Sequence, residues 1–259
     1  MNFQKIALIA LLSAGVLFSC KKKDDKPEEE TPVVTPTPAP TIAKIKSETM
    51  TTNSNGTTVS SKTDYEYDSN GRVIKMTRDD GSYSTLTWGS TQVIQKDFDD
   101  NTVTTPASIS TYDLNASGLC ISQSQGTLGT TATYEYNADG YQTKMTTTNS
   151  GQTTVLNFVI TNGNQTSMST TFSGFPMTMT IEYFTDKTNT IGNVNHGMTI
   201  FGKDSKNLAK KMSTNVLGQT TASDITYQFD SKNRVSKMSQ TQTVSGITTS
   251  NSTSYTYFD

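Results

Sequence analysis

The sequence predicts an all-β protein built as an antiparallel up-and-down meander. From about residue 41 onward, short segments alternate apolar and polar residues, as in Thr63–Tyr67 and Tyr255–Phe258, and this period of two is typical of strands. Turn dipeptides such as Asp139-Gly140 and Asn162-Gly163 separate these segments, because Asn and Gly tolerate the positive φ of tight hairpins. No window repeats its apolar residues with a helical period over three turns. We therefore expect roughly 14 to 17 strands.

The first twenty residues have the order of a lipoprotein signal. Lys5 provides a basic start, Ile6–Leu12 is apolar, and residues 17–19 lie directly before Cys20. This arrangement is similar to a bacterial lipobox, in which the thiol of Cys20 receives a diacylglycerol and becomes the new N-terminus. We expect a signal peptide over residues 1–19 and lipidation of Cys20 by several acyl chains such as palmitate, because one short chain binds a membrane only marginally.

Residues 20–40 are interpreted as a charged, proline-rich tether. Nine of the ten residues in Lys21–Glu30 are charged, and five of the seven prolines lie between residues 27 and 40. Such a segment stays solvated and extended, and holds the following domain away from the bilayer. Its acidic run resembles the surface-export signal of some Gram-negative lipoproteins. We expect an outer-membrane lipoprotein exposed at the cell surface, with a periplasm-facing anchor as the alternative.

One sequence unit recurs within the single β domain that we expect over residues 41–259. In its clear copies two aromatic residues lie two positions apart and share one strand face. An Asp or Asn then bonds the backbone of the turn, and a Gly or Asn takes the left-handed position. The spacing is irregular, which favours one hairpin type reused inside a long sheet over a solenoid. The clear copies are residues 65–76, 134–145 and 227–238, and the weaker copies are residues 112–119 and 201–212.

The strand that follows the first repeat contains a conflict of period. Val73 and Met76 are both apolar, but they differ in parity, so a regular strand would point them to opposite faces. Either a β-bulge lies between them or both faces are covered near that end of the sheet.

The Tyr-x-Tyr-Asp-x-x-Gly-Arg-Val units resemble the YD-type repeats of bacterial surface proteins. Together with the lipobox, the tether and the stretch Ile181–Asn193 leading to Gly202–Leu208, they resemble a family of Gram-negative lipoproteins of unknown function with a porin-like fold. The resemblance covers residues 41–259 and implies a meander curled into a barrel or half-barrel. That family has no assigned activity, so the resemblance carries over no functional residue.

Composition and charge argue against several classes of function. The formal net charge is −2 and no basic patch is visible along the chain, so nucleic acid is not an expected partner. After residue 20 no apolar run approaches the ~18 residues of a membrane helix. A bilayer-spanning barrel needs an apolar outer band, whereas residues 143–149 show a face rich in Thr, Asn and Lys. We expect aromatic residues and methionines to point inward and the threonine-rich face to meet water.

Cysteine and histidine offer little chemistry. With Cys20 acylated, Cys120 has no disulfide partner, and we expect it to be a small apolar residue in a strand core rather than a reactive thiol. His196 is the single histidine. Without a second histidine or a cysteine pair it cannot form a typical zinc site, and no Gly-x-Ser-x-Gly elbow suggests a Ser-His-Asp triad. We expect His196 in a loop or at the surface.

Acidic residues give two weak motifs. Glu182 and Asp186 could be imagined as a glycosidase pair, but they lie four apart where a strand ends, and nothing in the sequence indicates a sugar cleft. A second group could offer oxygens to calcium, but it lacks the order of a calcium loop, and a solvated turn is the expected structure. This group comprises Asp97, Asp99, Asp100 and Asn101.

No catalytic, metal or cofactor motif emerges, so we expect a protein that is not an enzyme. The leading hypothesis is an envelope protein whose β domain binds a glycan or an envelope partner or has a structural role. Trp88 and Tyr83 are candidates for stacking on a sugar, although core packing is their commoner use. The alternative is a carrier of a lipid or other hydrophobic ligand, lined by methionines, and the third hypothesis is an envelope hydrolase.

The shape of the interior distinguishes these hypotheses. A filled barrel favours a scaffold or surface binding, and an open apolar cavity favours a carrier. A polar cleft containing Glu182 or His196 would favour an enzyme. The sequence leaves the oligomeric state open.

Overall fold

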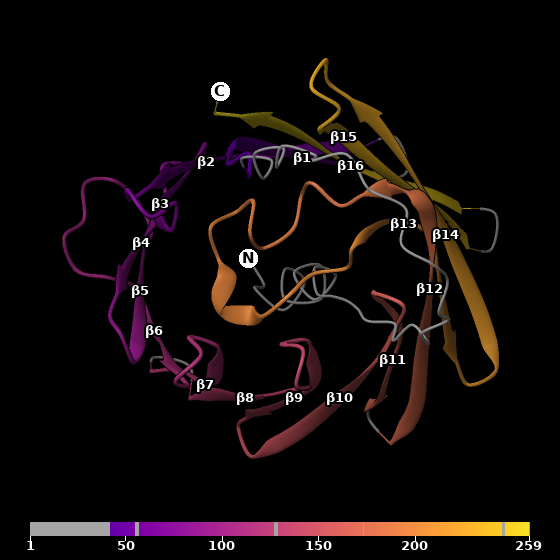
Figure 1. Cartoon of the computed structure of the whole chain (residues 1–259), viewed down its shortest axis with the longest axis horizontal. Helices are drawn as coiled ribbons and strands as arrows, with labels where there is room; N and C mark the ends of the chain where they lie inside the picture. Colours follow the sequence, from indigo (N-terminus) through magenta and orange to yellow (C-terminus); the bar gives the residue numbers. More distant parts are fainter. Residues whose placement is uncertain (1–41, 55–56, 127–128, 173, 245–246, 259) are drawn as a thin grey trace, which may run out of the picture.

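The chain forms a closed barrel of sixteen antiparallel strands, each paired with its neighbours along the chain, with β1 closing on β16 (Figure 1). The computed structural model describes residues 42–54, 57–126, 129–172, 174–244 and 247–258. The predicted signal peptide, Cys20 and the tether lie outside these residues and remain predictions. The strands are β1 (Ile45–Ser54), β2 (Thr57–Tyr67), β3 (Val73–Arg78), β4 (Tyr83–Trp88), β5 (Gln92–Phe98), β6 (Ser108–Leu114), β7 (Cys120–Gln125), β8 (Thr130–Tyr136), β9 (Gln142–Asn149), β10 (Gln152–Thr161), β11 (Asn164–Phe172), β12 (Phe175–Thr188), β13 (Asn207–Val216), β14 (Gln219–Phe229), β15 (Val235–Val244) and β16 (Ile247–Tyr257).

This architecture confirms the predicted all-β meander and decides between the barrel and the half-barrel. Because the strands alternate in direction, every second hairpin lies at the same end of the barrel. One end carries the connections β2–β3, β4–β5, β6–β7, β8–β9, β10–β11, β12–β13 and β14–β15, and we call it the repeat end.

Alternation along the strands separates an apolar inner face from a polar outer face. Tyr65 on β2 pairs with Met76 on β3, and both point into the barrel. The next pair, Glu66 and Lys75, points outward and forms an ion pair of 3.3 Å. The register continues this division around the wall. The expectation that aromatics and methionines face inward is confirmed for the two hydrophobic clusters of the described barrel.

A β-bulge near the repeat end reconciles Val73 with Met76. Tyr67 pairs with Val73 and Glu66 pairs with Lys75, so Ile74 is an extra residue without an opposite partner. The insertion changes the parity of the strand and turns both Val73 and Met76 inward. Equivalent shifts occur in β1, β3, β7, β9, β11, β13 and β15.

On six of the even-numbered strands an aromatic residue bonds to one of these bulges. Its hydroxyl donates to the main-chain carbonyl of the residue that begins the bulge on the preceding strand, at 2.6–2.9 Å, and Trp88 does the same with its indole N–H. The bond satisfies a carbonyl that the interrupted ladder leaves free. The six pairs are Tyr67–Ile45, Trp88–Val73, Tyr136–Cys120, Tyr183–Gln165, Tyr227–Ala209 and Tyr257–Val235.

The repeat turn is built around one side-chain oxygen. Asp68 Oδ1 accepts hydrogen bonds from the backbone N–H groups of Asn70 and Arg72, both at 2.9 Å, and Gly71 takes a positive φ of 72°. Asn115, Asn137 and Asp230 accept the corresponding pairs of bonds. Four of the five predicted copies are therefore hairpins of one type.

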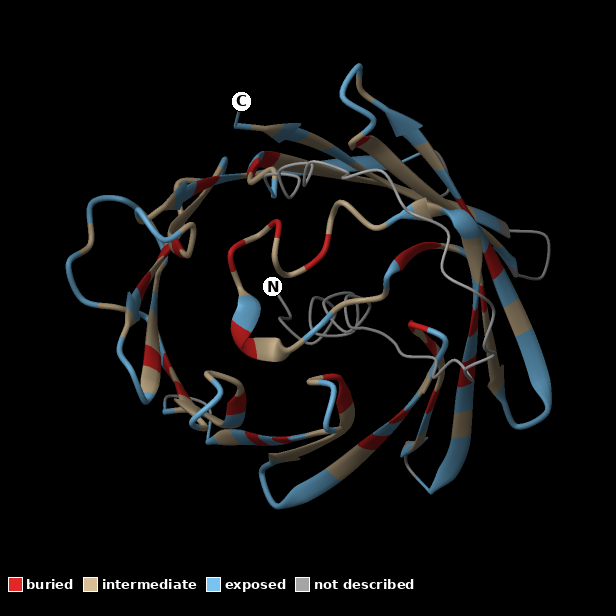
Figure 2. Ribbon diagram, viewed as in Figure 1, coloured by how far each residue is buried: buried red, intermediate tan, exposed pale blue. Residues whose placement is uncertain are grey.

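The fifth predicted copy, residues 201–212, is not a hairpin. Phe201 ends a short 3₁₀ helix, η3 (Thr199–Phe201), and β13 begins at Asn207. The helix η3 belongs to a long connection between β12 and β13, residues 189–206, and β13 follows it. We call this connection the lumen segment. In Figure 1 it crosses the inside of the ring of strands. Figure 2 shows buried residues along this segment and along the inner wall, and exposed residues at the hairpin tips.

Candidate functional site

The barrel interior is divided into a packed region and a cavity. Ile200 of the lumen segment is 2 % exposed and packs with inward side chains from β1 to β8. A second cluster follows the inner face of β10 to β15. Beside this second cluster lies a cavity of about 310 Å³, which is at the lower end of the size range of small-molecule sites. Among the described residues, the lumen segment thus packs against the β1–β8 side of the interior, and the cavity lies on the other side.

Methionine dominates the wall of this cavity. Six of the ten methionines of the chain line it, and they come from five strands. The period of two places them there, because each occupies an inward position of its strand. The six are Met50, Met168, Met177, Met179, Met212 and Met238.

Four of these methionines lie on three adjacent strands. Met168 on β11 is directly opposite Met179 on β12. Met177 is the preceding inward position of β12, and Met212 on β13 pairs with Ile181, the following one. Met168, Met179 and Met212 are each at most 8 % exposed. Opposite and diagonal neighbours on a sheet are within reach of long side chains, so the thioethers of Met168, Met177 and Met179 form one compact group, with Met212 diagonal to Met179 at its edge.

The remaining wall of the cavity is polar but uncharged. Serine, threonine, asparagine and glutamine from β13 to β16 complete it, and none of the described lining residues carries a formal charge. Asn251 Oδ1 is buried and has no hydrogen-bond partner among the described residues. An unsatisfied buried acceptor costs about 1–3 kcal/mol, so the cavity favours an occupant with an apolar body and one donor or cationic atom near Asn251.

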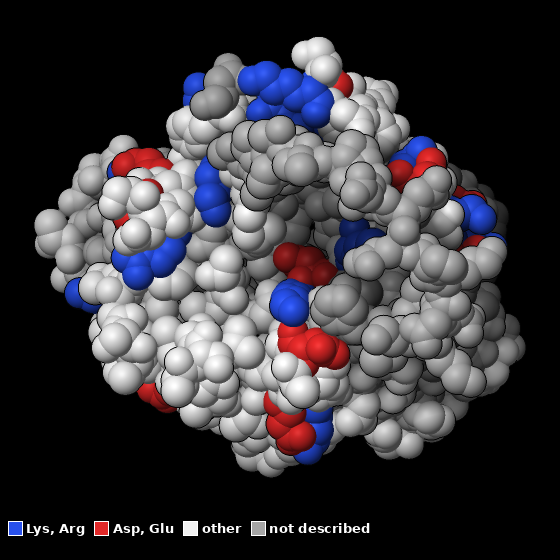
Figure 3. Space-filling model, in the orientation of Figure 1, with Lys and Arg blue, Asp and Glu red and all other residues white. Residues whose placement is uncertain are grey.

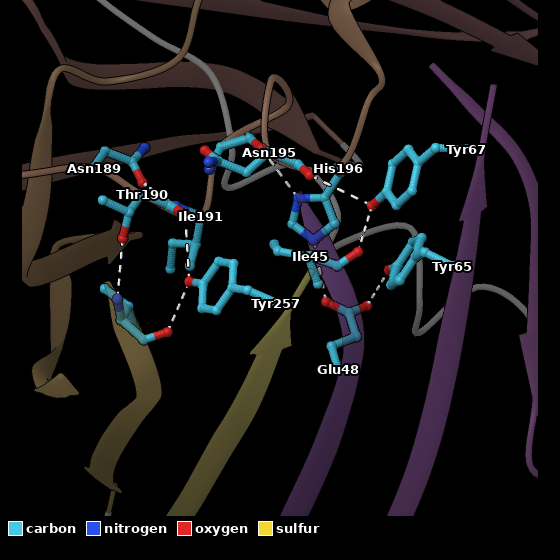
Figure 4. A network of polar contacts seen from close by, with 12 residues as sticks. Ile45, Glu48, Tyr65, Tyr67, Asn189, Thr190, Ile191, Asn195, His196 and Tyr257 are labelled. Carbon is cyan, nitrogen blue, oxygen red and sulfur yellow. Dashed lines mark hydrogen bonds and ion pairs between the residues drawn. The ribbon is translucent and has the colours of Figure 1, made fainter. Parts of the chain in front are cut away.

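A polar network ties the lumen segment to the wall (Figure 4). His196 Nε2 lies 3.3 Å from Glu48 Oε2 on β1, and Tyr65 on β2 donates its hydroxyl to Glu48 Oε1 at 2.7 Å. The Nδ1 atom of His196 lies 3.1 Å from the carbonyl oxygen of Gly192. Burial alone would lower the pKa of His196, but its hydrogen bond and charge interaction with Glu48 raise it above the usual value. The pair is therefore charged over a wider pH range than a free histidine would allow.

Asp204 is the second unusual acid of the lumen segment. Its Oδ2 accepts the Asn193 N–H at 2.6 Å, whereas its buried Oδ1 has no partner among the described residues. Burial raises the pKa of Asp204 to about 7, although the Asn193 N–H and the nearby charge of His196 act in the opposite direction. Asp204 thus changes charge close to neutral pH, while the raised pKa of His196 keeps its ring protonated to higher pH than usual.

Backbone hydrogen bonds also hold the lumen segment. The N–H of Ile45 donates to the Asn195 carbonyl at 3.0 Å, and the N–H of Val73 donates to the Gly197 carbonyl at 3.3 Å. Both donors begin bulged strands, so the segment satisfies N–H groups that the bulges leave out of the ladder. On the opposite side, Lys203 donates its N–H to the Gly140 carbonyl at 3.0 Å.

The structure places the single histidine inside the barrel. His196 lies in a loop, as expected, but the alternative of a surface position is wrong, because the β12–β13 connection folds inward. Cys120 agrees with its prediction: it is 0 % exposed within the first cluster, and burial raises the pKa of its thiol to about 12. A thiol with such a pKa is a poor nucleophile.

The other candidates do not converge on a site. Glu182 and Asp186 are exposed, with side chains 59 % and 72 % accessible, so they share no enclosed sugar cleft. Trp88 and Tyr83 lie on opposite faces of β4: Trp88 donates its indole N–H to Val73 inside the barrel, and Tyr83 stacks on Phe98 with ring centroids 4.5 Å apart on the outside. They cannot hold one sugar between them.

The acidic group around Phe98 is also divided. Asp97 points inward and accepts hydrogen bonds from Ser84, Ser108 and Gln95, while Asp100 bonds Thr102 in an exposed turn. Within the described residues, no three His, Cys, Asp or Glu side chains are grouped as metal ligands. No described helix is long and apolar enough to cross a membrane. Figure 3 shows acidic and basic side chains in several small groups over one face of the barrel.

The methionine pattern of the sequence indicated part of the cavity wall but not the cavity as a whole. The methionines were expected to line a concave face, and Met177 and Met179 have the spacing of one strand face. Their grouping with Met168 and Met212 depends on register, which the closed barrel fixes.

Comparisons with known proteins find similarity at the level of fold. No family model and no curated protein sequence matches the chain. Among solved structures, a porin-like protein from Bacteroides uniformis aligns with a TM-score of 0.63 and 15 % identity, covering 83 % of this chain and 98 % of that one. A porin-like protein from Bacteroides vulgatus aligns with a TM-score of 0.50 and 8 % identity, covering 83 % and 99 %. These matches support the barrel fold and assign no activity.

Proposed function

We propose that this barrel binds a small apolar molecule in its methionine-lined cavity, at the cell envelope, where a lipid on Cys20 anchors it. The observation that carries the proposal is the convergence of six methionines on one cavity of about 310 Å³. Methionine is flexible and polarisable, and it adapts to irregular apolar ligands. Of the three hypotheses raised by the sequence, the carrier is the one that an apolar cavity supports.

The outer wall supports attachment by lipid rather than by a bilayer-spanning barrel. Ion pairs lie across its outward positions, at 3.3 Å for Lys75–Glu66 and 2.7 Å for Lys144–Glu135. A membrane barrel needs an apolar band about 25 Å tall on this face. Porin-like neighbours from Bacteroides agree with an envelope protein, and the lipobox-like Cys20 gives the means of attachment.

The anchor is tested by membrane fractionation. Cys20→Ser removes the thiol that would carry the lipid, and we expect the variant to leave the envelope fraction while the wild-type chain stays in it. Cys120→Ser, which changes the other cysteine, is the matched control and should fractionate as wild type. If Cys20→Ser remains in the envelope fraction, the lipid anchor is wrong.

Ligand binding is tested by filling the cavity. Thr214 lines it on β13, and the neighbouring Ser213 points outward. We expect purified Cys20→Ser protein to bind the apolar fluorophore N-phenyl-1-naphthylamine, and Thr214→Trp to abolish this binding. Ser213→Trp introduces the same side chain on the outer face and should bind as the parent protein does. Equal binding by both tryptophan variants would exclude the cavity as the ligand site, and mass spectrometry of native protein would show any co-purified apolar molecule.

A further inference from the structure

We propose that the same methionines bind a soft monovalent metal ion of the Cu(I) class through their thioether sulfurs. Thioethers are soft ligands that select Cu(I) over hard or borderline ions. Met168, Met177 and Met179 supply three of them from inward positions of two adjacent strands. This inference uses the cavity of the proposed function but does not depend on an apolar ligand being bound there.

Register brings the sulfurs within reach of one another. Met168 and Met179 are a directly opposed pair, for which Cβ atoms lie about 4.5–5.5 Å apart. Met177 is diagonal to Met168, and Met212 is diagonal to Met179, at roughly 7–8 Å. Each side chain has three rotatable bonds, so the sulfurs of Met168, Met177 and Met179 can turn toward one point in the cavity. Met212 is paired with Ile181, four residues along the strand from Met177 and about 13 Å away, so it is too far to share that point.

The charge of the wall limits which ion can enter. No described lining residue is charged, and the cost of burying an ion without a counter-charge is large and rises with the square of its charge. Divalent ions such as Zn²⁺ and Ca²⁺ prefer imidazole, thiolate or carboxylate ligands, which this wall lacks. The buried, unpartnered Asn251 Oδ1 adds the negative end of an amide dipole that favours a cation.

Leucine substitution separates the thioether from its packing. Met→Leu keeps an apolar side chain of similar volume and usually costs little stability, but it removes the sulfur. A protein with Met168, Met177 and Met179 all changed to Leu should still bind the apolar fluorophore. It should lose its affinity for Ag(I), the air-stable soft ion that we choose as the probe.

The experiment measures Ag(I) binding by the full mature chain in a Cys20→Ser, Cys120→Ala background, because thiols would compete for the ion. In chloride-free buffer, isothermal titration should give one Ag(I) per chain, and the triple leucine variant should bind at least about 100-fold more weakly. Met76→Leu together with Met145→Leu is the matched control, because these inward methionines do not line the cavity, and it should retain full affinity.

Methyl-¹³C methionine spectra locate the ion. Ag(I) should shift the signals of the cavity methionines and leave those of Met76 and Met198 in place. Single Met→Leu variants provide the same comparison if the triple variant does not fold. Unchanged affinity in the leucine variants, or equal losses in the control pair, would overturn the metal site. Fluorophore binding without Ag(I) binding would leave the proposed function standing, whereas loss of both in the parent protein would remove both proposals.

Discussion

Glu48 on β1 and His196 in the lumen segment are 148 residues apart in the chain, yet Glu48 Oε2 and His196 Nε2 lie 3.3 Å apart inside the barrel. Tyr65 donates a second bond to Glu48, and Asp204 adds its charge to His196 from the same segment. The contact fixes the place where the long β12–β13 connection meets the wall. It also makes the packing of this connection against the wall depend on the protonation of His196 and Glu48.

The first prediction is that stability falls as pH rises through neutrality. The pKa of His196 is raised in the folded protein. Its contribution to the free energy of unfolding is therefore complete below its unfolded pKa of about 6.5, and it is lost as pH rises through its folded pKa. The pKa of Asp204 is raised to about 7, so the folded state favours its neutral form and is penalised at higher pH. Both effects lower stability as pH rises: the Asp204 penalty accumulates from its unfolded pKa of 3.8 up to its folded value of about 7, and the loss from His196 begins near its unfolded value and continues through its raised folded pKa.

Protonation of Glu48 lowers the stability of the folded protein at acid pH. Its pKa is lowered: burial alone would raise it, but the bonds from His196 and Tyr65 lower it. Its contribution is therefore present above the unfolded pKa and is lost as pH falls through the folded one. Urea unfolding from pH 4 to pH 8.5 should show a maximum on the acid side of neutrality. Asp204→Asn should flatten the decline that accompanies rising pH up to about pH 7 and add about 1–3 kcal/mol at pH 8, and an unchanged profile would contradict this assignment.

The second prediction concerns the bulge-binding aromatics. Tyr67 donates its hydroxyl to the Ile45 carbonyl at 2.6 Å. Tyr67→Phe keeps the ring and leaves that carbonyl unsatisfied, so we expect a loss of about 1–3 kcal/mol in the free energy of unfolding. Tyr83→Phe removes a hydroxyl on the outer face, whose contact with the Val103 carbonyl is long at 3.5 Å, and should change stability by less than about 0.5 kcal/mol. Similar losses in the two variants would show that the bulge bond has no special role.

The third prediction concerns the repeat turn. Asp68→Ala removes the oxygen that accepts the Asn70 and Arg72 N–H groups, and it should cost about 1–2 kcal/mol by denaturant unfolding. Asp68→Asn keeps this acceptor, as Asn137 does naturally in the third turn. It should therefore recover most of the loss, apart from the ion pair with Arg72. A full loss in Asp68→Asn would mean that charge, and not the backbone bonds, stabilises the turn.

The fourth prediction tests how the lumen segment is seated. Gly197 has a φ of 69°, and a Cβ there would lie 2.7 Å from both Gly71 O and Val73 N. Gly197→Ala should therefore move the segment away from β3 and increase amide hydrogen exchange across residues 189–206. Gly151→Ala shares the positive φ, but a Cβ there would meet nothing within 4 Å, so it controls for backbone strain. Equal exchange in the two variants would mean that this close approach does not hold the segment.

The sequence alone determined the local structure of this protein. Its period of two, its turn dipeptides and its Tyr-x-Tyr-Asp units predicted an antiparallel meander with inward aromatics, because these signals act between residues a few positions apart. The same reasoning took residues 201–212 for another turn. Aspartate followed by Lys and Asn has the composition of a turn, and composition does not reveal that Asp204 is buried against Asn193.

Only the tertiary structure decided what the interior contains. Closure of β1 on β16 brings Glu48 within reach of His196, and the register of the wall places Met168 opposite Met179. These relationships depend on how sixteen strands curl and on where one loop folds back, and no local pattern encodes either. The physical reason is that each residue's preference fixes its own backbone and face, whereas a cavity is the volume left after all the inward side chains and the lumen segment have packed.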